Sequence, residues 1–232
     1  MLLLFDIDGT LVVGAAREHQ AALEQALLEV HRVDAHAIRS PLNPAGRTDG
    51  EIVRAILLDA GVSTDRIDEL AGEVRDRASQ AYARLCPRDL SQTVLAGMAE
   101  LLADLSARTG VTLGLTTGNF EPIARLKLAR AGLGKHFPTG QGAFGSDSED
   151  RAALPKIARR RAGSRGHPYS RAHTIVIGDT PLDIACARAD GVRCVAVATG
   201  QYGVDELAGA DAVARDAEGL RDVLEAQLTG TV

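Results

Sequence analysis

The segment Phe5-Asp6-Ile7-Asp8-Gly9-Thr10-Leu11 carries the strongest structural signal in the chain, and it directly follows the apolar run Leu2-Leu3-Leu4. A short continuous apolar run of this kind predicts a buried strand of a parallel sheet. Two carboxylates at the mouth of a core strand have no packing role, and unpaired charge there is costly. A bound divalent cation would relieve that cost, because such ions take carboxylate oxygens as ligands. The alternative is an ordinary strand-to-loop junction with two solvated acids.

The composition is that of a globular protein. The chain has 232 residues, of which 45% are apolar and 25% charged, enough for one large or two modest domains. A net charge of −5 argues against a nucleic-acid binder. No apolar stretch approaches the ~20 residues of a membrane span, and no signal peptide is visible, so we expect a cytoplasmic protein without a membrane partner. Cys86, Cys186 and Cys194 are odd in number and widely spaced, which predicts reduced thiols.

Predicted strands and helices alternate along the chain, which indicates an α/β fold with a parallel sheet. The predicted strands cover 2–7, 111–117, 173–178 and 192–197, with a weaker one at 211–214. The predicted helices cover 95–108, 120–131, 151–162, 181–190 and 216–228.

The interval between the first two strands is unusually long. About a hundred residues separate Ile7 from Val111, whereas a crossover needs only a dozen or more. Apolar residues recur there with helical period in three stripes, which begin at Leu23, Ile52 and Ile67. Residues 14–90 are therefore predicted to be a small helical bundle inserted after the first strand.

Polar motifs fall where the predicted parallel strands end, and ligands of open α/β sheets bind at that edge. Besides Asp6 and Asp8, the motifs are Thr116-Thr117-Gly118-Asn119, Asp150-Arg151, and the acid pair Asp179 and Asp183. A hydroxyl group together with free amides at a helix N-terminus suits a phosphate oxygen. The set predicts a site for a phosphorylated ligand and a cation.

This set of motifs, in this order, resembles the haloacid dehalogenase superfamily of phosphohydrolases, in particular its phosphoglycolate phosphatase-like branch. The resemblance covers nearly the whole chain and implies a Rossmann-like core, residues 1–13 and 91–232, with a helical cap over 14–90. It also implies a phosphoric monoester hydrolase that needs Mg²⁺. Such an enzyme hydrolyses a small phosphorylated metabolite through an aspartyl phosphate.

The resemblance assigns roles to the acids. Asp6 is expected to attack phosphorus, and Asp8 to protonate the leaving alkoxide and then deprotonate water. Donating that proton near neutral pH requires a raised pKa, so we expect the environment of Asp8 to raise it. Mg²⁺ is expected to bind Asp6, the backbone carbonyl of Asp8 and Asp179, with Asp183 as a further ligand or a supporting acid.

Two motif positions have competing candidates. Only one of Thr116 and Thr117 should point into the site because side chains alternate along a strand, and the family pattern favours Thr117. The third motif of the family has a lysine, whereas this chain offers Arg151 or Lys156. We favour Arg151 because the first turn of the helix should face the strand ends.

Other residues are expected to contact substrate. Gly118 and Asn119 are predicted to bind the substrate phosphate. In the predicted cap, Arg47 resembles a position that contacts a second anionic group, with a solvated arginine as the alternative. His19 lies where related mutases have a histidine, but its spacing favours a structural role.

The sequence leaves other functions open. A phosphosugar mutase of the β-phosphoglucomutase type shares the expected core. A 2-haloacid dehalogenase is disfavoured because that branch lacks the second aspartate, which is present here as Asp8. A non-catalytic binding module is the remaining alternative, since a fold alone does not prove activity. The sequence names neither the substrate nor the oligomeric state, for which a homodimer is kept as an expectation.

Overall fold

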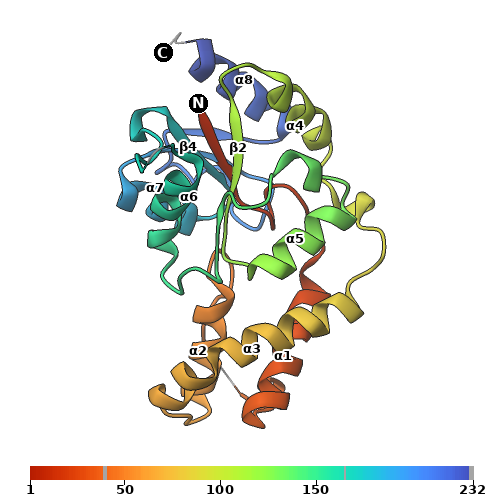
Figure 1. Ribbon diagram of the computed structural model, residues 1–232. Coiled ribbons are helices and arrows are strands. Elements are labelled where there is room, and N and C mark those ends of the chain that lie inside the picture. The colour runs from red at the N-terminus through yellow and green to blue at the C-terminus, as the bar shows by residue number, and fades with distance from the viewer. Residues whose placement is uncertain (39–40, 165, 230–232) are drawn as a thin grey trace.

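The protein has a six-stranded parallel sheet flanked by helices (Figure 1). The computed structural model describes residues 1–38, 41–164 and 166–229. The strand order is β3-β2-β1-β4-β5-β6. The strands are β1 (Leu2–Phe5), β2 (Thr112–Thr117), β3 (Ala143–Phe144), β4 (Thr174–Gly178), β5 (Arg193–Val197) and β6 (Ala212–Ala214). The predicted parallel α/β fold is confirmed; the two-residue strand β3 was not predicted.

Strand β1 lies at the centre of the sheet. Its last residue, Phe5, pairs with Leu115 of β2 and Ile177 of β4. The amide of Asp6 continues this pairing by donating to the carbonyl of Ile177 at 2.8 Å. Because all strands run in the same direction, the residues that follow β1, β2 and β4 meet at one edge.

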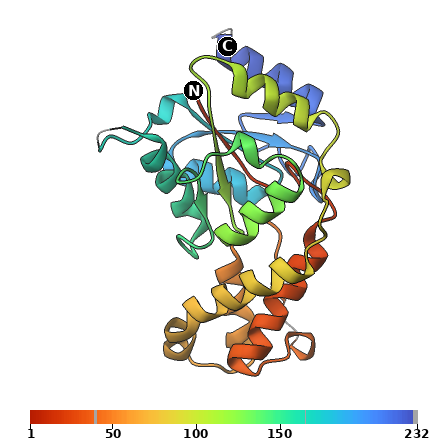
Figure 2. The same ribbon diagram turned by 45° about the vertical axis from the view of Figure 1, so that its right-hand side comes forward.

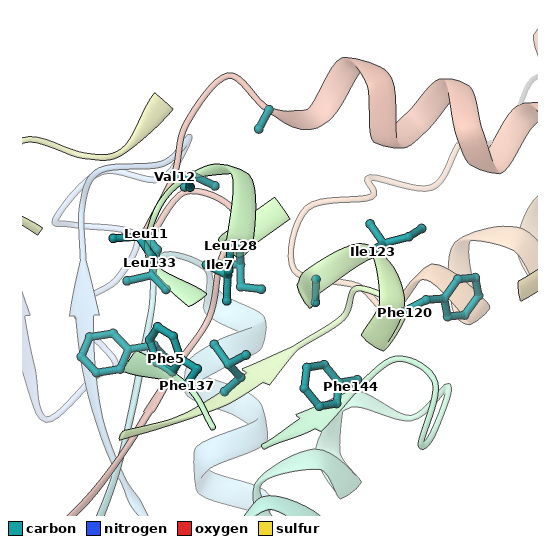
Figure 3. Packing of buried hydrophobic residues seen from close by; sticks show 14 of the residues in the cluster. Phe5, Ile7, Leu11, Val12, Phe120, Ile123, Leu128, Leu133, Phe137 and Phe144 are labelled. Carbon is teal, nitrogen blue, oxygen red and sulfur yellow. The ribbon is translucent and has the colours of Figure 1, made fainter. Parts of the chain in front are cut away.

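The two faces of β1 pack against different helices, as the alternation of side chains along a strand requires. Leu3 and Phe5 belong to a cluster with α4 (Met98–Ala107), α5 (Glu121–Arg130) and α8 (Ala217–Thr229). In that cluster the rings of Phe5 and Phe137 pack edge to face, and their centroids lie 6.1 Å apart (Figure 3). Leu2 and Leu4 belong to a second cluster with α6 (Leu154–Ala162) and α7 (Pro181–Asp190).

The predicted helix 151–162 begins differently from the prediction. Residues Arg151–Ala153 form a 3-10 turn, and α6 starts only at Leu154. The reason is Pro155, which has no amide hydrogen to donate to the carbonyl of Arg151. The amide of Leu154 donates to that carbonyl instead, which closes the tighter turn.

In the described part of the chain, three α-helices follow β1 and precede α4, and they lie beyond the carboxyl edge of the sheet (Figures 1 and 2). They are α1 (Ala16–His31), α2 (Asp49–Asp59) and α3 (Thr64–Leu85). The three predicted apolar stripes fall on them, and buried residues such as Ala26 and Ala78 join their interfaces to the core cluster. The division into a core and a cap over 14–90 stays a prediction. Among the described residues, no helix has both the length and the apolar character of a membrane span.

Candidate active site

Three carboxylates crowd together at the carboxyl edge of the sheet. Asp6 follows β1, Asp179 follows β4, and Asp183 lies in the first turn of α7. Each offers an oxygen within 4.8 Å of the other two, and all three are buried. Asp6, Asp179 and Asp183, which were predicted to lie at this edge, are therefore close together.

The crowding changes the proton affinity of these acids. Burial raises the pKa of Asp6 to about 6, with Arg151 acting against it and Asp183 adding to it. Burial and the nearby charge of Asp6 raise the pKa of Asp179 to about 8. Like charges this close disfavour ionisation of each other, and a divalent cation between them would remove that penalty. The donor set consists of carboxylate oxygens, which fits Mg²⁺.

Two segments enclose Asp179: the loop after β1 and the loop after β5, of which the second was not predicted from the sequence. The hydroxyl of Thr10 donates to its Oδ1 at 3.1 Å. The loop after β5 covers the other oxygen so closely that a Cβ atom on Gly200 would lie 1.8 Å from Oδ2. Thr199 fixes this loop by donating its hydroxyl to the carbonyl of Gly9 at 2.6 Å. A glycine at position 200 therefore allows the burial that raises the pKa of Asp179.

Asp183 has several partners within the protein. Its Oδ1 accepts a hydrogen bond from Arg151. Its Oδ2 accepts from the amide of Thr180 at 3.0 Å and from the Thr180 hydroxyl at 2.7 Å, which makes Asp183 part of a capping box at the start of α7. This geometry gives Asp183 a clear structural role, and its role as a metal ligand stays a prediction.

Arg151 lies against Asp6, whereas Lys156 does not reach the site. The Nη2 atom of Arg151 is 3.2 Å from Oδ2 of Asp6, and the side chain is only 6% exposed. Its Nε is buried without a hydrogen-bond partner among the described residues. Buried donors are normally satisfied, so this N–H is suited to an incoming phosphate oxygen. Lys156 lies on the exposed face of α6, so of the two candidates only Arg151 is placed next to Asp6.

Asp8 is held by a residue that the sequence analysis missed. Lys127 of α5 is fully buried, and its Nζ lies 2.7 Å from both carboxylate oxygens of Asp8. Burial alone would raise the pKa of Asp8, but the Lys127 ammonium outweighs it, with help from His19, and holds this pKa below its usual value. The expected raised pKa of Asp8 is therefore wrong for the protein without substrate, because that expectation did not include a buried cation.

The burial of Lys127 could have been predicted from its position in the sequence. Lys127 shares a helical face with Ile123, Ala124 and Leu128, all of which are buried. A lysine on the apolar face of an amphipathic helix is seldom buried without a partner. The chain has only two other lysines, Lys135 and Lys156, so this placement was distinctive.

Asn119 contacts Asp8 directly. Its Nδ2 donates to Oδ2 of Asp8 at 2.9 Å, and its Oδ1 accepts from Lys127 at 2.9 Å. The N-cap position of α5 is occupied by the next residue, Phe120, without a side-chain hydrogen bond. Asn119 also lines the pocket at this edge, and its predicted contact with substrate stays a prediction.

The helices between β1 and α4 contact the loop after β2 through Asp49. Its Oδ2 accepts from the amide of Phe120 at 2.7 Å and lies 3.0 Å from Nε2 of His19. Its own amide donates to the carbonyl of Gly118 at 2.8 Å. The approach is so close that a Cβ atom on Gly118 would lie 2.0 Å from the carbonyl oxygen of Arg47. The residue at position 118 therefore allows this contact, and its predicted phosphate binding stays a prediction.

A pocket of about 940 Å³ lies between the helices and the carboxyl edge. Arg47 lines it, but its guanidinium is paired with Glu51, and its Nε donates to the carbonyl of Asn43 at 3.0 Å. His19 also lines the pocket and is buried. Whether Arg47 or His19 contacts substrate stays a prediction. Further lining residues are Asp6, Asp8, Gly118, Asn119, Arg151 and Asp179.

The choice between the two threonines of β2 also stays a prediction. Both side chains are fully buried. Thr117 accepts a hydrogen bond from the amide of Asn119 at 3.4 Å. The hydroxyl of Thr116 has no partner within the described part of the chain.

Comparisons with known proteins identify the family to which this chain belongs. The family model for haloacid dehalogenase-like hydrolases matches residues 3–188. A phosphoglycolate phosphatase of Rhodospirillum rubrum is 31% identical over 215 residues, which cover 91% of this chain and 84% of that protein.

Two solved structures share the fold over almost their whole length. A hydrolase from Pseudomonas syringae has 23% identity and a TM-score of 0.65, with 97% of this chain and 98% of that chain covered. A beta-phosphoglucomutase from Clostridium difficile has 17% identity and a TM-score of 0.65, with 94% of this chain and 92% of that chain covered. The chain belongs to the haloacid dehalogenase-like hydrolase family and is a phosphoric monoester hydrolase.

Proposed function

We propose that this phosphatase hydrolyses a small phosphorylated metabolite with the help of Mg²⁺, through an aspartyl phosphate (an acyl phosphate) formed on Asp6. The observation that carries the proposal is the pairing of Arg151 with Asp6 beside the cluster of Asp6, Asp179 and Asp183. A carboxylate nucleophile, a fixed cation and a crowded set of oxygen ligands are the parts that phosphoryl transfer requires.

The reaction divides into two steps. A carboxylate oxygen of Asp6 forms a bond to phosphorus while the bond to the leaving oxygen breaks, and the alkoxide takes a proton from Asp8. A water molecule then gives one proton to Asp8 and forms a bond to phosphorus, while the bond between phosphorus and the Asp6 oxygen breaks. This step releases inorganic phosphate and restores the Asp6 carboxylate and the protonated Asp8. The dianionic phosphate of the substrate counteracts the effect of Lys127 on the pKa of Asp8, because a nearby negative charge favours the protonated acid.

Mg²⁺ would be held by Asp6, the backbone carbonyl of Asp8 and Asp179, with Asp183 beside them. When bound, it would neutralise charge on the phosphate oxygens. Arg151 orients the phosphate against Asp6, and its Nε–H, which has no hydrogen-bond partner among the described residues, is one donor for that task. Thr117, Gly118 and Asn119 are proposed to bind the remaining phosphate oxygens.

The test is a screen of phosphate esters with Mg²⁺ present, followed by the same assay in excess chelator. The panel should include phosphoglycolate, because the relative from Rhodospirillum rubrum is a phosphoglycolate phosphatase. Turnover that depends on the metal supports the proposal, and unchanged turnover in chelator contradicts the metal site. A cap over 14–90, a homodimer and a cytoplasmic location remain predictions that this assay does not address.

A further inference from the structure

The ammonium group of Lys127 is held by two side chains that line the pocket, Asp8 and Asn119. Its ammonium has three donors, and three acceptor oxygens lie within 2.9 Å: both oxygens of Asp8 and Oδ1 of Asn119. Burying an ammonium is costly unless it is paired in this way. The side chain is fully buried, whereas that of Asp8 is 34% exposed and lines the pocket.

The contacts close a triangle around Asp8. Asn119 donates to Oδ2 of Asp8 and accepts from Lys127, so each of the three side chains contacts the other two. Asp8 lies on the loop after β1, whereas its two partners belong to α5 and to the loop that precedes it. The triangle therefore fixes a loop carboxylate against a helix that packs on the sheet.

We propose that Lys127 is a positioning residue that holds the Asp8 carboxylate in the orientation from which it exchanges a proton with the leaving group. The proposal rests on the proposed function, in which Asp8 has that task. A proton donor must lie within hydrogen-bond reach of the leaving oxygen, and a displacement of about 1 Å can cost ~10²-fold in rate.

The role of Lys127 differs from that of Arg151 because the two cations contact different acids. Arg151 contacts Asp6 and Asp183, and Lys127 contacts Asp8, so each of the two reacting acids has its own buried cation. The Nζ atom of Lys127 also lies 3.4 Å from Nδ1 of His19. The opposite ring nitrogen of His19 lies 3.0 Å from Asp49. The positioning contacts thus continue into the helices that form the other wall of the pocket.

The kinetic test is a double-mutant cycle with Lys127→Met and Asp8→Asn. It compares an alkyl phosphate from the screen with para-nitrophenyl phosphate, whose leaving group needs little protonation. Lys127→Met should lower kcat for the alkyl ester by roughly 10–100-fold, which is less than the ~10²–10⁴-fold of general acid catalysis because Asp8 itself is retained. For the aryl ester, kcat should fall by about threefold or less. In the Asp8→Asn background, Lys127→Met should cause no further loss beyond about threefold, because the residue that it positions is already inactive.

The control is Arg159→Met. Arg159 also forms a buried ion pair, with Asp190 at 2.6 Å, and neither residue lines this pocket. It should lower stability without changing the ratio of alkyl to aryl turnover.

The proposal is overturned if folded Lys127→Met loses the same factor in kcat on both esters. It is also overturned if kcat of the double variant is well below that of Asp8→Asn. If Lys127→Met does not fold, the double variant, which removes both charges of the pair, can still be compared with Asp8→Asn.

A crystallographic readout keeps the proposal separate from the proposed function. In Lys127→Met crystals the Asp8 carboxylate should leave its wild-type orientation while Asp6 stays in place. An Asp8 carboxylate that remains within about 0.5 Å of its wild-type position overturns the positioning role. Wild-type protein that hydrolyses no phosphate ester would instead contradict the proposed function, and the crystal comparison would still decide what Lys127 does.

Discussion

Removing Arg151 should damage both stability and catalysis, because two buried carboxylates depend on it. The guanidinium contacts Asp6 at 3.2 Å and also Asp183; the side chains of all three residues are at most 6% exposed. Removing one partner of a buried ion pair costs about 3–5 kcal/mol, because the remaining charge is left without a counterion. Arg151→Met should therefore lower the free energy of unfolding by that amount in metal-free buffer, as measured by denaturant titration.

The same variant should shift the pH dependence of activity. Arg151 acts to lower the pKa of Asp6, which burial raises to about 6. Without the guanidinium this pKa should rise further, so Asp6 becomes ionised only at higher pH. Since Asp6 attacks as the carboxylate, the acidic limb of the profile of kcat/KM against pH should move to higher pH.

The loss of phosphate binding should add to this effect. A charge-assisted hydrogen bond contributes about 1.5–3 kcal/mol, which corresponds to roughly 10–150-fold in kcat/KM at the pH optimum. Arg159→Met removes one of the two arginines that pair with the buried Asp190, and neither Arg159 nor Asp190 lines the pocket. It is the control for the loss of a buried ion pair, and it should keep its kcat/KM. An Arg151→Met protein within about 0.5 kcal/mol of wild-type stability, with an unshifted pH profile, would refute this reasoning.

Four further outcomes follow from the same geometry. Asp6→Asn should abolish turnover of alkyl and aryl phosphates, because an amide forms no acyl phosphate; residual turnover in a steady-state assay would argue for another nucleophile. Mg²⁺ affinity measured by calorimetry should increase as the pH rises toward about 8, because protons compete for Asp179 below its raised pKa; a flat profile would contradict this. Gly200→Ala should weaken Mg²⁺ binding, since the new Cβ displaces Asp179; unchanged affinity by calorimetry would contradict the crowding. Arg47→Ala should lower kcat/KM for the natural substrate by roughly 10–150-fold only if substrate displaces Glu51 from the guanidinium, and an equal loss on para-nitrophenyl phosphate would indicate a defect in folding or closure.

The sequence predicted those parts of the site that depend on strand order. Asp6 and Asp179 were expected to meet because each follows a buried apolar strand, and parallel strands end at one edge. Arg151 was preferred to Lys156 from its place in the first turn, although Pro155 makes that turn a 3-10 turn. In each case the backbone alone brings the residue to the edge.

The parts that were missed depend on how the helices pack. Asp49 lies on α2 and reaches the amide of Phe120 only because the loop at Arg47 and Thr48 packs against Gly118. No periodicity in the sequence gives the distance between such separate elements. β3 was missed for a related reason: two residues, Ala143 and Phe144, are too few to show a strand pattern, and they pair only because β2 is already in place.

The wrong pKa expectation for Asp8 shows why a motif alone does not determine the electrostatics of its residues. Burial and the neighbouring acids dominate at Asp6 and Asp179, and both pKa values are raised. Asp8 is only two residues from Asp6, but it lies next to Lys127, and its pKa is lowered. The pKa values of two acids in one short motif are thus shifted in opposite directions. The shifts come from burial and from charged side chains that belong to other elements of the fold. Because Lys127 is 119 residues from Asp8 along the chain, only the packing of α5 against the loop after β1 brings the pair together.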